Sequence, residues 1–336
     1  MKYDTLIRQA LIIDGSNTEG YVADVGLRDG RIETIGDLSA ARAEHEIEAA
    51  GRVLAPGFID VHTHDDTVVI RQPQMLPKLS QGVTTVIVGN CGISASPVSL
   101  RSDPPDPMNL LGNREQFCYP RFSDYRNAVQ GADPAVNVAA LIGHTALRSN
   151  HMDDLHRTAT PYEIAAMRVQ LQESLEAGAL GLSTGLAYAS AFNAKTDEVL
   201  QLVEELTAYG AVYTTHLRSE FEPVLEAMDE AFLIGRHARV PVIISHLKCA
   251  GAGNWGRSPQ LLAALEAAAK DHPVGCDCYP YAASSSTLDL KQVTDAFRIT
   301  ITWSTPHPDM GGRDLQDIAA LWGLSLLDTA RRLQPA

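Results

Sequence analysis

Histidine and cysteine residues stand directly after apolar runs of this sequence. His62 and His64 are two residues apart at the end of the run 58–61, and Cys91 lies just beyond the run 84–88. Side chains two apart on a strand point to the same face, so both imidazoles can reach one ion. Imidazole and thiolate are ligands that zinc accepts readily. The spacing therefore predicts a metal site.

Two further histidines end apolar runs in the same way. His216 follows the run 212–215, and His246 follows the run 240–245. Each could be a buried structural histidine, and Cys91 could be a small buried hydrophobe. Four histidines and one cysteine at the same end of four predicted strands are harder to explain in that way. Because catalytic zinc sites keep a position open for water, the set predicts a catalytic metal centre.

The run 178–183 contains no lysine, and this bears on how many metals could bind. Some barrel metallohydrolases bridge two metals with a carboxylated lysine at this strand, and neither the run nor its exit contains a lysine. Cys91 could fill the bridging role instead. Whether one or two metals bind stays open.

The elements that must position these residues alternate between strand and helix. Thr160 to Glu163 form a capping box with Pro161 at the first helical position, Gly210 closes a helix predicted at 196–209, and Ser258-Pro259 opens another. Near-continuous apolar runs between the helices suit buried parallel strands. Repeated units of this kind predict a parallel sheet or a (β/α) barrel. Seven strands are predicted, at 58–61, 84–88, 136–142, 178–183, 212–215, 240–245 and 274–277.

Two regions depart from this alternation. Residues 1–55 consist of short alternating runs with a hairpin signal at Asp29-Gly30, which predicts a small antiparallel β unit before a barrel domain at 56–336. The long segment 98–134 could be a lid over the site or a surface excursion that buries its own aromatic residues. Segment 315–333 is helix-like, so an eighth barrel strand is not expected within this sequence.

Bulk properties limit the function classes. The net charge of −14 over 336 residues argues against a nucleic-acid-binding surface. No secretory signal and no membrane-spanning run is recognised. Five scattered cysteines in such a chain predict reduced thiols and a cytoplasmic location. The expected partner is a small molecule, and the oligomeric state is not predicted.

Several motifs resemble a known family. The run 56–64, PGFIDVHTH, resembles the first-strand signature of the amidohydrolase superfamily. Other motifs together resemble the N-acyl-D-amino-acid deacylase (D-aminoacylase) family, and this likeness extends over essentially the whole chain. They are TTVIVGNCGIS (84–94), GALGLSTGLAY (178–188), YTTHLRSE (213–220), ISHLKCAG (244–251) and DCYPYAASSS (277–286).

The resemblance implies a TIM-like (β/α) barrel of the metal-dependent amidohydrolase type. It implies that zinc polarises the acyl carbonyl of an N-acyl-D-amino acid, whose hydrolysis gives a carboxylate and a free D-amino acid. By the same resemblance, Cys91, His216 and His246 hold a tightly bound zinc, and His62 and His64 form a second, weaker metal position.

The resemblance also assigns the substrate carboxylate to Lys248 and to Tyr279 or Tyr281. A fixed ammonium and a phenol suit a carboxylate, although Lys248 could equally be a solvated surface residue and the tyrosines core residues. Whether the substrate side chain is neutral or acidic stays open.

The sequence departs from the family pattern toward its C-terminus. The catalytic aspartate of the family, in a Gly-Ser-Asp-type motif, finds no match after Trp303, and neither does a downstream arginine. No catalytic residue is therefore assigned, and the chain is expected to be a fragment. The alternatives are a cyclic-amidase-type amidohydrolase and a non-catalytic metal-binding remnant.

Overall fold

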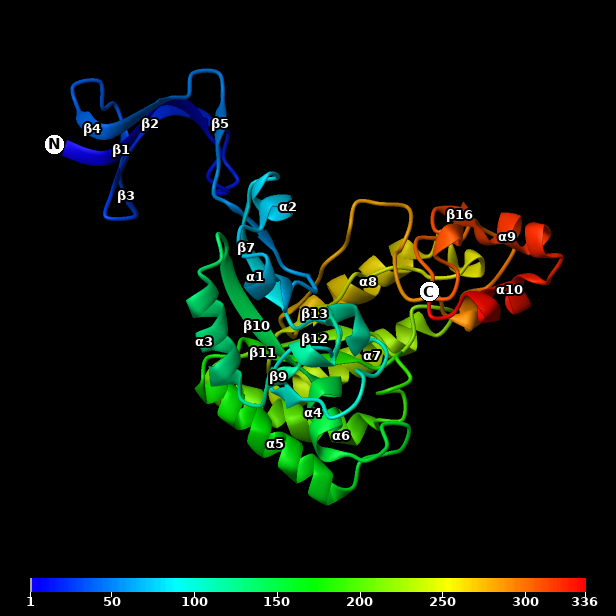
Figure 1. Cartoon of the computed structure of the whole chain (residues 1–336). Coiled ribbons are helices and arrows are strands. Elements are labelled where there is room, and N and C mark those ends of the chain that lie inside the picture. The colour runs from blue at the N-terminus through cyan, green and yellow to red at the C-terminus, as the bar shows by residue number, and fades with distance from the viewer. Residues whose placement is uncertain (1) are drawn as a thin grey trace. The chain divides into compact units, whose positions relative to one another are not determined.

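The computed structural model describes residues 2–336, and these form two compact units. One unit contains the chain up to Ile59 together with Ser80–Thr84, and the other contains Asp60–Leu79 and Thr85–Ala336. Figure 1 labels many of their helices and strands. The predicted division into 1–55 and 56–336 stays a prediction.

The first unit is built on one sheet with the strand order β3-β2-β1-β4, and β5 also pairs with β1. Asp29 and Gly30 both adopt positive φ, at 50° and 70°, and connect β2 to β3 as the hairpin signal predicted. The prediction of a purely antiparallel unit is wrong, because β4 and β5 pair with β1 in parallel. The strands are β1 (Lys2–Ile12), β2 (Tyr21–Arg28), β3 (Arg31–Gly36), β4 (Arg42–Glu48) and β5 (Val53–Leu54).

A seven-stranded sheet contains a strand at each of the seven predicted positions. Its order is β14-β13-β12-β11-β10-β7-β6, and the strands from β7 to β14 pair in parallel. Chain order is thus kept across the sheet, as in a (β/α) barrel. The strands are β6 (Phe58–Asp60), β7 (Val83–Val88), β10 (Asn137–Gly143), β11 (Gly181–Gly185), β12 (Val212–His216), β13 (Val242–Ile244) and β14 (Val274–Cys276).

Helices connect these strands, and their ends follow local sequence signals. Thr160 caps α5 by accepting a hydrogen bond from the backbone N–H of Glu163, whose carboxylate accepts from the Thr160 N–H. The predicted helix at 196–209 is α-helical to Val203, continues as a 3₁₀ helix and ends at Gly210, whose φ is 60°. The helices are α1 (Val68–Arg71), α2 (Leu76–Leu79), α3 (Phe122–Ala132), α4 (His144–His151), α5 (Pro161–Glu176), α6 (Thr196–Val203), α7 (Val224–Ala238) and α8 (Ser258–Ala269).

The segment 98–134 is folded rather than extended. Strands β8 (Val98–Ser99) and β9 (Cys118–Tyr119) pair within it, and α3 follows. Its aromatic side chains Phe117, Phe122 and Tyr125 are buried. A buried apolar cluster joins it to neighbouring elements through Ile93, Val98, Met108, Leu111, Phe117 and Ala146. A role as a lid stays a prediction.

The last fifty residues build a second apolar cluster. Strands β15 (Thr300–Ile301) and β16 (Arg313–Asp314) pair with each other, and two helices follow. The helix predicted at 315–333 is broken at Gly323, which has φ of 64°, into α9 (Leu315–Trp322) and α10 (Leu326–Leu333). Among the described residues, no helix is both long and apolar enough to cross a membrane.

Candidate metal centre

The five residues predicted as metal ligands converge in the structure. His62 and His64 follow β6, Cys91 follows β7, His216 is the last residue of β12, and His246 follows β13. They form two groups, and within each group the ligand atoms lie within 4.8 Å of one another. His62, His64 and Cys91 make the first group, and Cys91, His216 and His246 make the second. Cys91 belongs to both.

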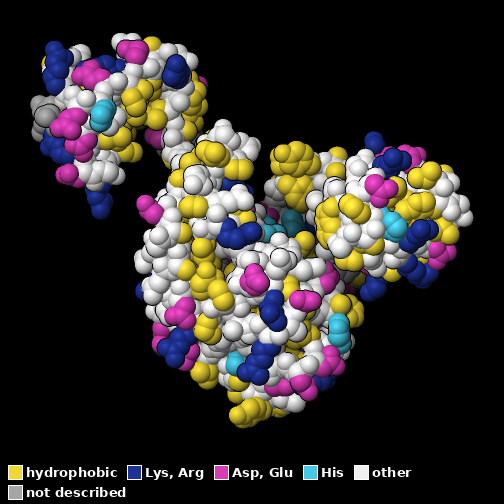
Figure 2. Space-filling model, viewed as in Figure 1, with side chains coloured by type: hydrophobic (Ala, Val, Ile, Leu, Met, Phe, Trp, Pro, Cys, Tyr) yellow, Lys and Arg dark blue, Asp and Glu magenta, His cyan; other side chains and the backbone are white. Residues whose placement is uncertain are grey.

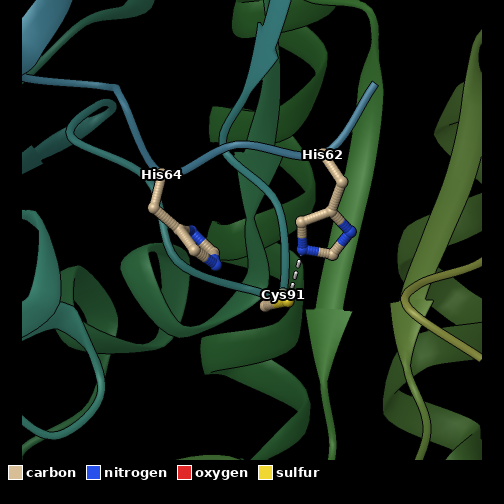
Figure 3. Close-up of side chains that lie close together, drawn as sticks. All are labelled: His62, His64 and Cys91. Carbon is tan, nitrogen blue, oxygen red and sulfur yellow. Dashed lines mark hydrogen bonds between the residues drawn. The ribbon is translucent and has the colours of Figure 1, made fainter. Parts of the chain in front are cut away.

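The short distances all involve the Cys91 sulfur. Its Sγ lies 3.2 Å from Nε2 of His62 and 3.3 Å from Nε2 of His246. Figure 3 shows His62 and His64 approaching Cys91 from the same segment of the chain. That segment is a loop, because β6 ends at Asp60. The two imidazoles therefore do not converge through the alternation of side chains along a strand, as the sequence predicted.

An unusual backbone conformation places the Cys91 thiol in the cluster. Cys91 has φ of 55° and Gly92 has φ of 76°. A Cβ on Gly92 would lie 2.5 Å from the backbone nitrogen of Gly185, so only glycine fits there. His246 also has a positive φ, of 38°. Two positive-φ non-glycine residues within one cluster are typical of a functional site.

Burial sets the electrostatics of the cluster. It lowers the pKa of His64 to about 3, with the neighbouring His62 and His246 adding to the effect, and it lowers the pKa of His216 to about 3. Burial raises the pKa of the Cys91 thiol above its usual range, so a cation must stabilise the thiolate. Within the described structure the buried Nδ1 of His64 has no hydrogen-bond partner. Neutral imidazoles, an unpartnered ring nitrogen and a cation-dependent thiolate all fit a bound zinc ion.

Sequence reasoning assigned no role to three other residues in the cluster. Asp277 accepts a hydrogen bond from the backbone N–H of His246 at 2.7 Å, and its Oδ1 lies 3.1 Å from Nδ1 of His62. Glu220 Oε1 lies 3.0 Å from Nδ1 of His246. The Tyr188 hydroxyl lies 3.1 Å from Nδ1 of His216. All three residues lie within the sequence motifs that resemble the deacylase family, and those motifs could have drawn attention to them.

Two of the three predicted substrate-binding residues lie at this cluster. Lys248 donates to Glu220 Oε1 at 2.5 Å, and its Nζ lies 5.9 Å from the centre of the Tyr279 ring. Burial opposes ionisation of Glu220, but its hydrogen bond to His246 and the charges of His216 and Lys248 lower its pKa to about 2. Tyr281 is 75% exposed, and the described structure does not bring it into the group.

Four imidazoles and a thiol gathered at the ends of β6, β7, β12 and β13 form a donor set that fits a metal-dependent barrel enzyme. Comparison with known proteins makes the class specific. The amidohydrolase family model matches residues 45–336, and the chain belongs to this family.

Three similar proteins are deacylases. A solved D-aminoacylase with a binuclear metal centre is 46% identical, and the match covers 99% of this chain and 70% of that one with a TM-score of 0.95. The N-acyl-D-aspartate deacylase of Alcaligenes xylosoxydans xylosoxydans is 46% identical over 334 residues, which are 99% of this chain and 67% of the relative. A solved N-acyl-D-glutamate deacylase from Bordetella bronchiseptica, complexed with zinc and a phosphonate inhibitor, is 42% identical. That match covers 100% of this chain and 71% of the other, with a TM-score of 0.96.

Proposed function

We propose that this chain hydrolyses the amide bond of N-acyl-D-amino acids at a zinc centre, giving a carboxylate and a free D-amino acid. The observation that carries the proposal is the convergence of one thiol and four imidazoles, with Cys91 common to both ligand groups. The similarity to deacylases of this substrate class supports it. These relatives lend no support to a cyclic amide substrate.

The candidate site residues have different proposed roles, which follow from the chemistry of their side chains. Cys91, His216 and His246 would hold the zinc, and His62 and His64 with Cys91 would form a second position. Zinc supplies polarisation of the acyl carbonyl and a lowered pKa of water. The Lys248 ammonium and the Tyr279 hydroxyl would bind the substrate carboxylate.

Proton transfer is not assigned to a residue of this chain. The two carboxylates in the cluster, Glu220 and Asp277, are both engaged with imidazoles or with Lys248. A cytoplasmic location belongs to the same proposal, since the Cys91 thiol must stay reduced to bind a metal.

The test combines metal analysis with hydrolysis of N-acetyl-D-methionine, N-acetyl-D-aspartate and N-acetyl-D-glutamate by the purified chain. We expect about one tightly bound zinc per chain, and hydrolysis of a D-substrate in preference to its L-enantiomer. The three substrates decide whether a neutral or an acidic side chain is preferred.

Absence of zinc, or hydrolysis of a hydantoin without hydrolysis of any N-acetyl amino acid, would contradict the proposal.

A further inference from the structure

A carboxylate lies behind two of the candidate metal ligands. Glu220 follows the end of β12 by four residues, and its side chain is only 12% exposed. Its Oε1 lies 3.0 Å from Nδ1 of His246, and its Oε2 lies 3.9 Å from Nε2 of His216. One carboxylate therefore faces two imidazoles that come from different strands.

Glu220 faces one ring nitrogen of each of the two imidazoles. His246 presents its Nε2 to the Cys91 sulfur at 3.3 Å, which leaves Nδ1 on the far side. His216 presents its Nδ1 to the Tyr188 hydroxyl at 3.1 Å and its Nε2 to Oε2 of Glu220. With Nδ1 as the metal-binding atom, Nε2 would be the remote nitrogen of that ring.

Metal binding would require one proton placement in each ring. A ring nitrogen that binds a metal carries no proton, so the remote nitrogen of a neutral imidazole must carry it. In both rings that proton faces an oxygen of Glu220. The contact to His246 is within hydrogen-bond distance, whereas the 3.9 Å contact to His216 is too long for a hydrogen bond.

Lys248 connects the same carboxylate to the substrate side of the site. Its Nζ lies 2.8 Å from Nδ1 of His246 and 2.5 Å from Oε1 of Glu220. An ammonium can only donate, so a protonated Nδ1 offers it no acceptor. With His246 in the metal-binding tautomer, Glu220 is the acceptor that holds Lys248 in this group.

We propose that Glu220 is a positioning residue that fixes His246 in the metal-binding tautomer and orients Lys248 toward the substrate carboxylate. It acts through these two side chains and binds no metal itself. The inference rests on the proposed metal centre and goes beyond it, because it predicts a coupling between zinc affinity and substrate binding through one carboxylate.

The first experiment measures zinc affinity by competition with a chelator. Glu220→Gln keeps the shape of the side chain but removes its charge, and we expect zinc to bind roughly 10–100-fold more weakly. Glu222→Gln makes the same change at an exposed position two residues away and should leave the affinity unchanged. Equal zinc affinity in wild type and Glu220→Gln would overturn the inference.

A second measurement excludes a general loss of structure. The metal-free variants are compared by circular dichroism and thermal unfolding, and the cobalt-substituted forms by their absorption spectra. We expect Glu220→Gln to change the cobalt spectrum, which reports ligand geometry, while Glu222→Gln does not. If Glu220→Gln fails to fold, Glu220→Asp replaces it, since this variant keeps the charge but withdraws the carboxylate by one methylene.

Hydrolysis assays keep this inference separate from the proposed function. If the purified chain turns over an N-acetyl-D-amino acid, we expect Glu220→Gln to raise KM more than Glu222→Gln, because Lys248 loses its acceptor. Weaker zinc binding by Glu220→Gln supports the inference even where no acyl-amino acid is hydrolysed. Unchanged zinc binding overturns it even where hydrolysis is confirmed.

Discussion

At the residue scale, the candidate centre depends most on Cys91. It is the shared member of both ligand groups, and its side chain is 1% exposed. A buried thiol with a raised pKa is a poor nucleophile, which favours a role in metal binding over attack on a substrate. Both metal positions should therefore respond to its replacement.

We predict that Cys91→Ser loses its bound zinc. Serine keeps the size of the side chain, but its hydroxyl does not ionise to give a soft ligand. Metal analysis of the purified protein should fall from about one zinc per chain to near none. Cys118→Ser, at an exposed cysteine outside the cluster, is the control. A full zinc complement in Cys91→Ser would show that the thiol is structural.

At the element scale, the turn after β7 positions the thiol, and Gly92 permits that turn. We predict that Gly92→Ala is less stable than wild type in urea unfolding and binds zinc more weakly. The added Cβ meets the Gly185 backbone at 2.5 Å, and the positive φ alone costs about 1–2 kcal/mol.

Gly30→Ala is the matched control for this prediction. Gly30 has φ of 70°, but a Cβ there meets nothing within 4 Å. It therefore carries the backbone strain without the clash, and zinc binding should be unaffected. Equal losses of stability in the two variants would mean that the clash at Gly92 is relieved by movement of β11.

A second element-scale feature is a buried ion group between α4 and α6. Glu198 lies 2.8 Å from Nε2 of His144 and accepts from Arg148 Nη1 at 2.5 Å, and all three side chains are buried. We predict that Glu198→Gln lowers the free energy of unfolding by about 3–5 kcal/mol, because the Arg148 charge stays buried without a counter-charge. Asp197→Asn, at the exposed neighbour on α6, should change it by less than about 0.5 kcal/mol.

The same carboxylate predicts a pH dependence. Burial opposes ionisation of Glu198, but His144 and Arg148 outweigh it and lower its pKa from 4.5 to about 2. The unfolded chain binds a proton at higher pH than the folded one, so this stability is present above pH 4.5 and is lost as pH falls toward 2. Urea unfolding from pH 6 to 3 should show a shallower decline in Glu198→Gln than in wild type. Identical slopes would contradict the assignment.

At the scale of the whole molecule, apolar side chains are exposed on the unit that carries β1 to β5. Val22 is 68% exposed, Ile32 66% and Val53 58%. Figure 2 shows hydrophobic side chains gathered on this unit. Exposed apolar patches on a β-sheet favour self-association.

We predict that the purified chain self-associates at micromolar concentration. Ile32→Lys combined with Val22→Lys should reduce this, because charges on a sheet oppose pairing between copies. Light scattering across a concentration series gives the measurement. Tyr162→Lys, at an 85% exposed residue of α5, is the control. A monodisperse wild-type monomer would contradict the prediction.

The alternation of strands and helices was predictable because its signals are local. Apolar runs located the seven strands of the larger sheet, and the Thr160 capping box located the start of α5. The positions of His62, His64, Cys91, His216 and His246 at strand ends followed from the same runs. Parallel strands place their carboxyl ends at one edge of a sheet, so their convergence could be expected from the sequence by itself.

Other features needed the tertiary structure. The parallel pairing of β1 with β4 depends on the path of the chain between them, which no turn motif marks. The contacts of Glu220 with His246 and of Asp277 with His62 join residues 26 and 215 positions apart, as 246 − 220 and 277 − 62. Residue types and local periodicity determined which side chains could bind a metal. Only the packing of strands against one another decided which carboxylates stand behind them, because sequence spacing carries no information about contacts across a sheet.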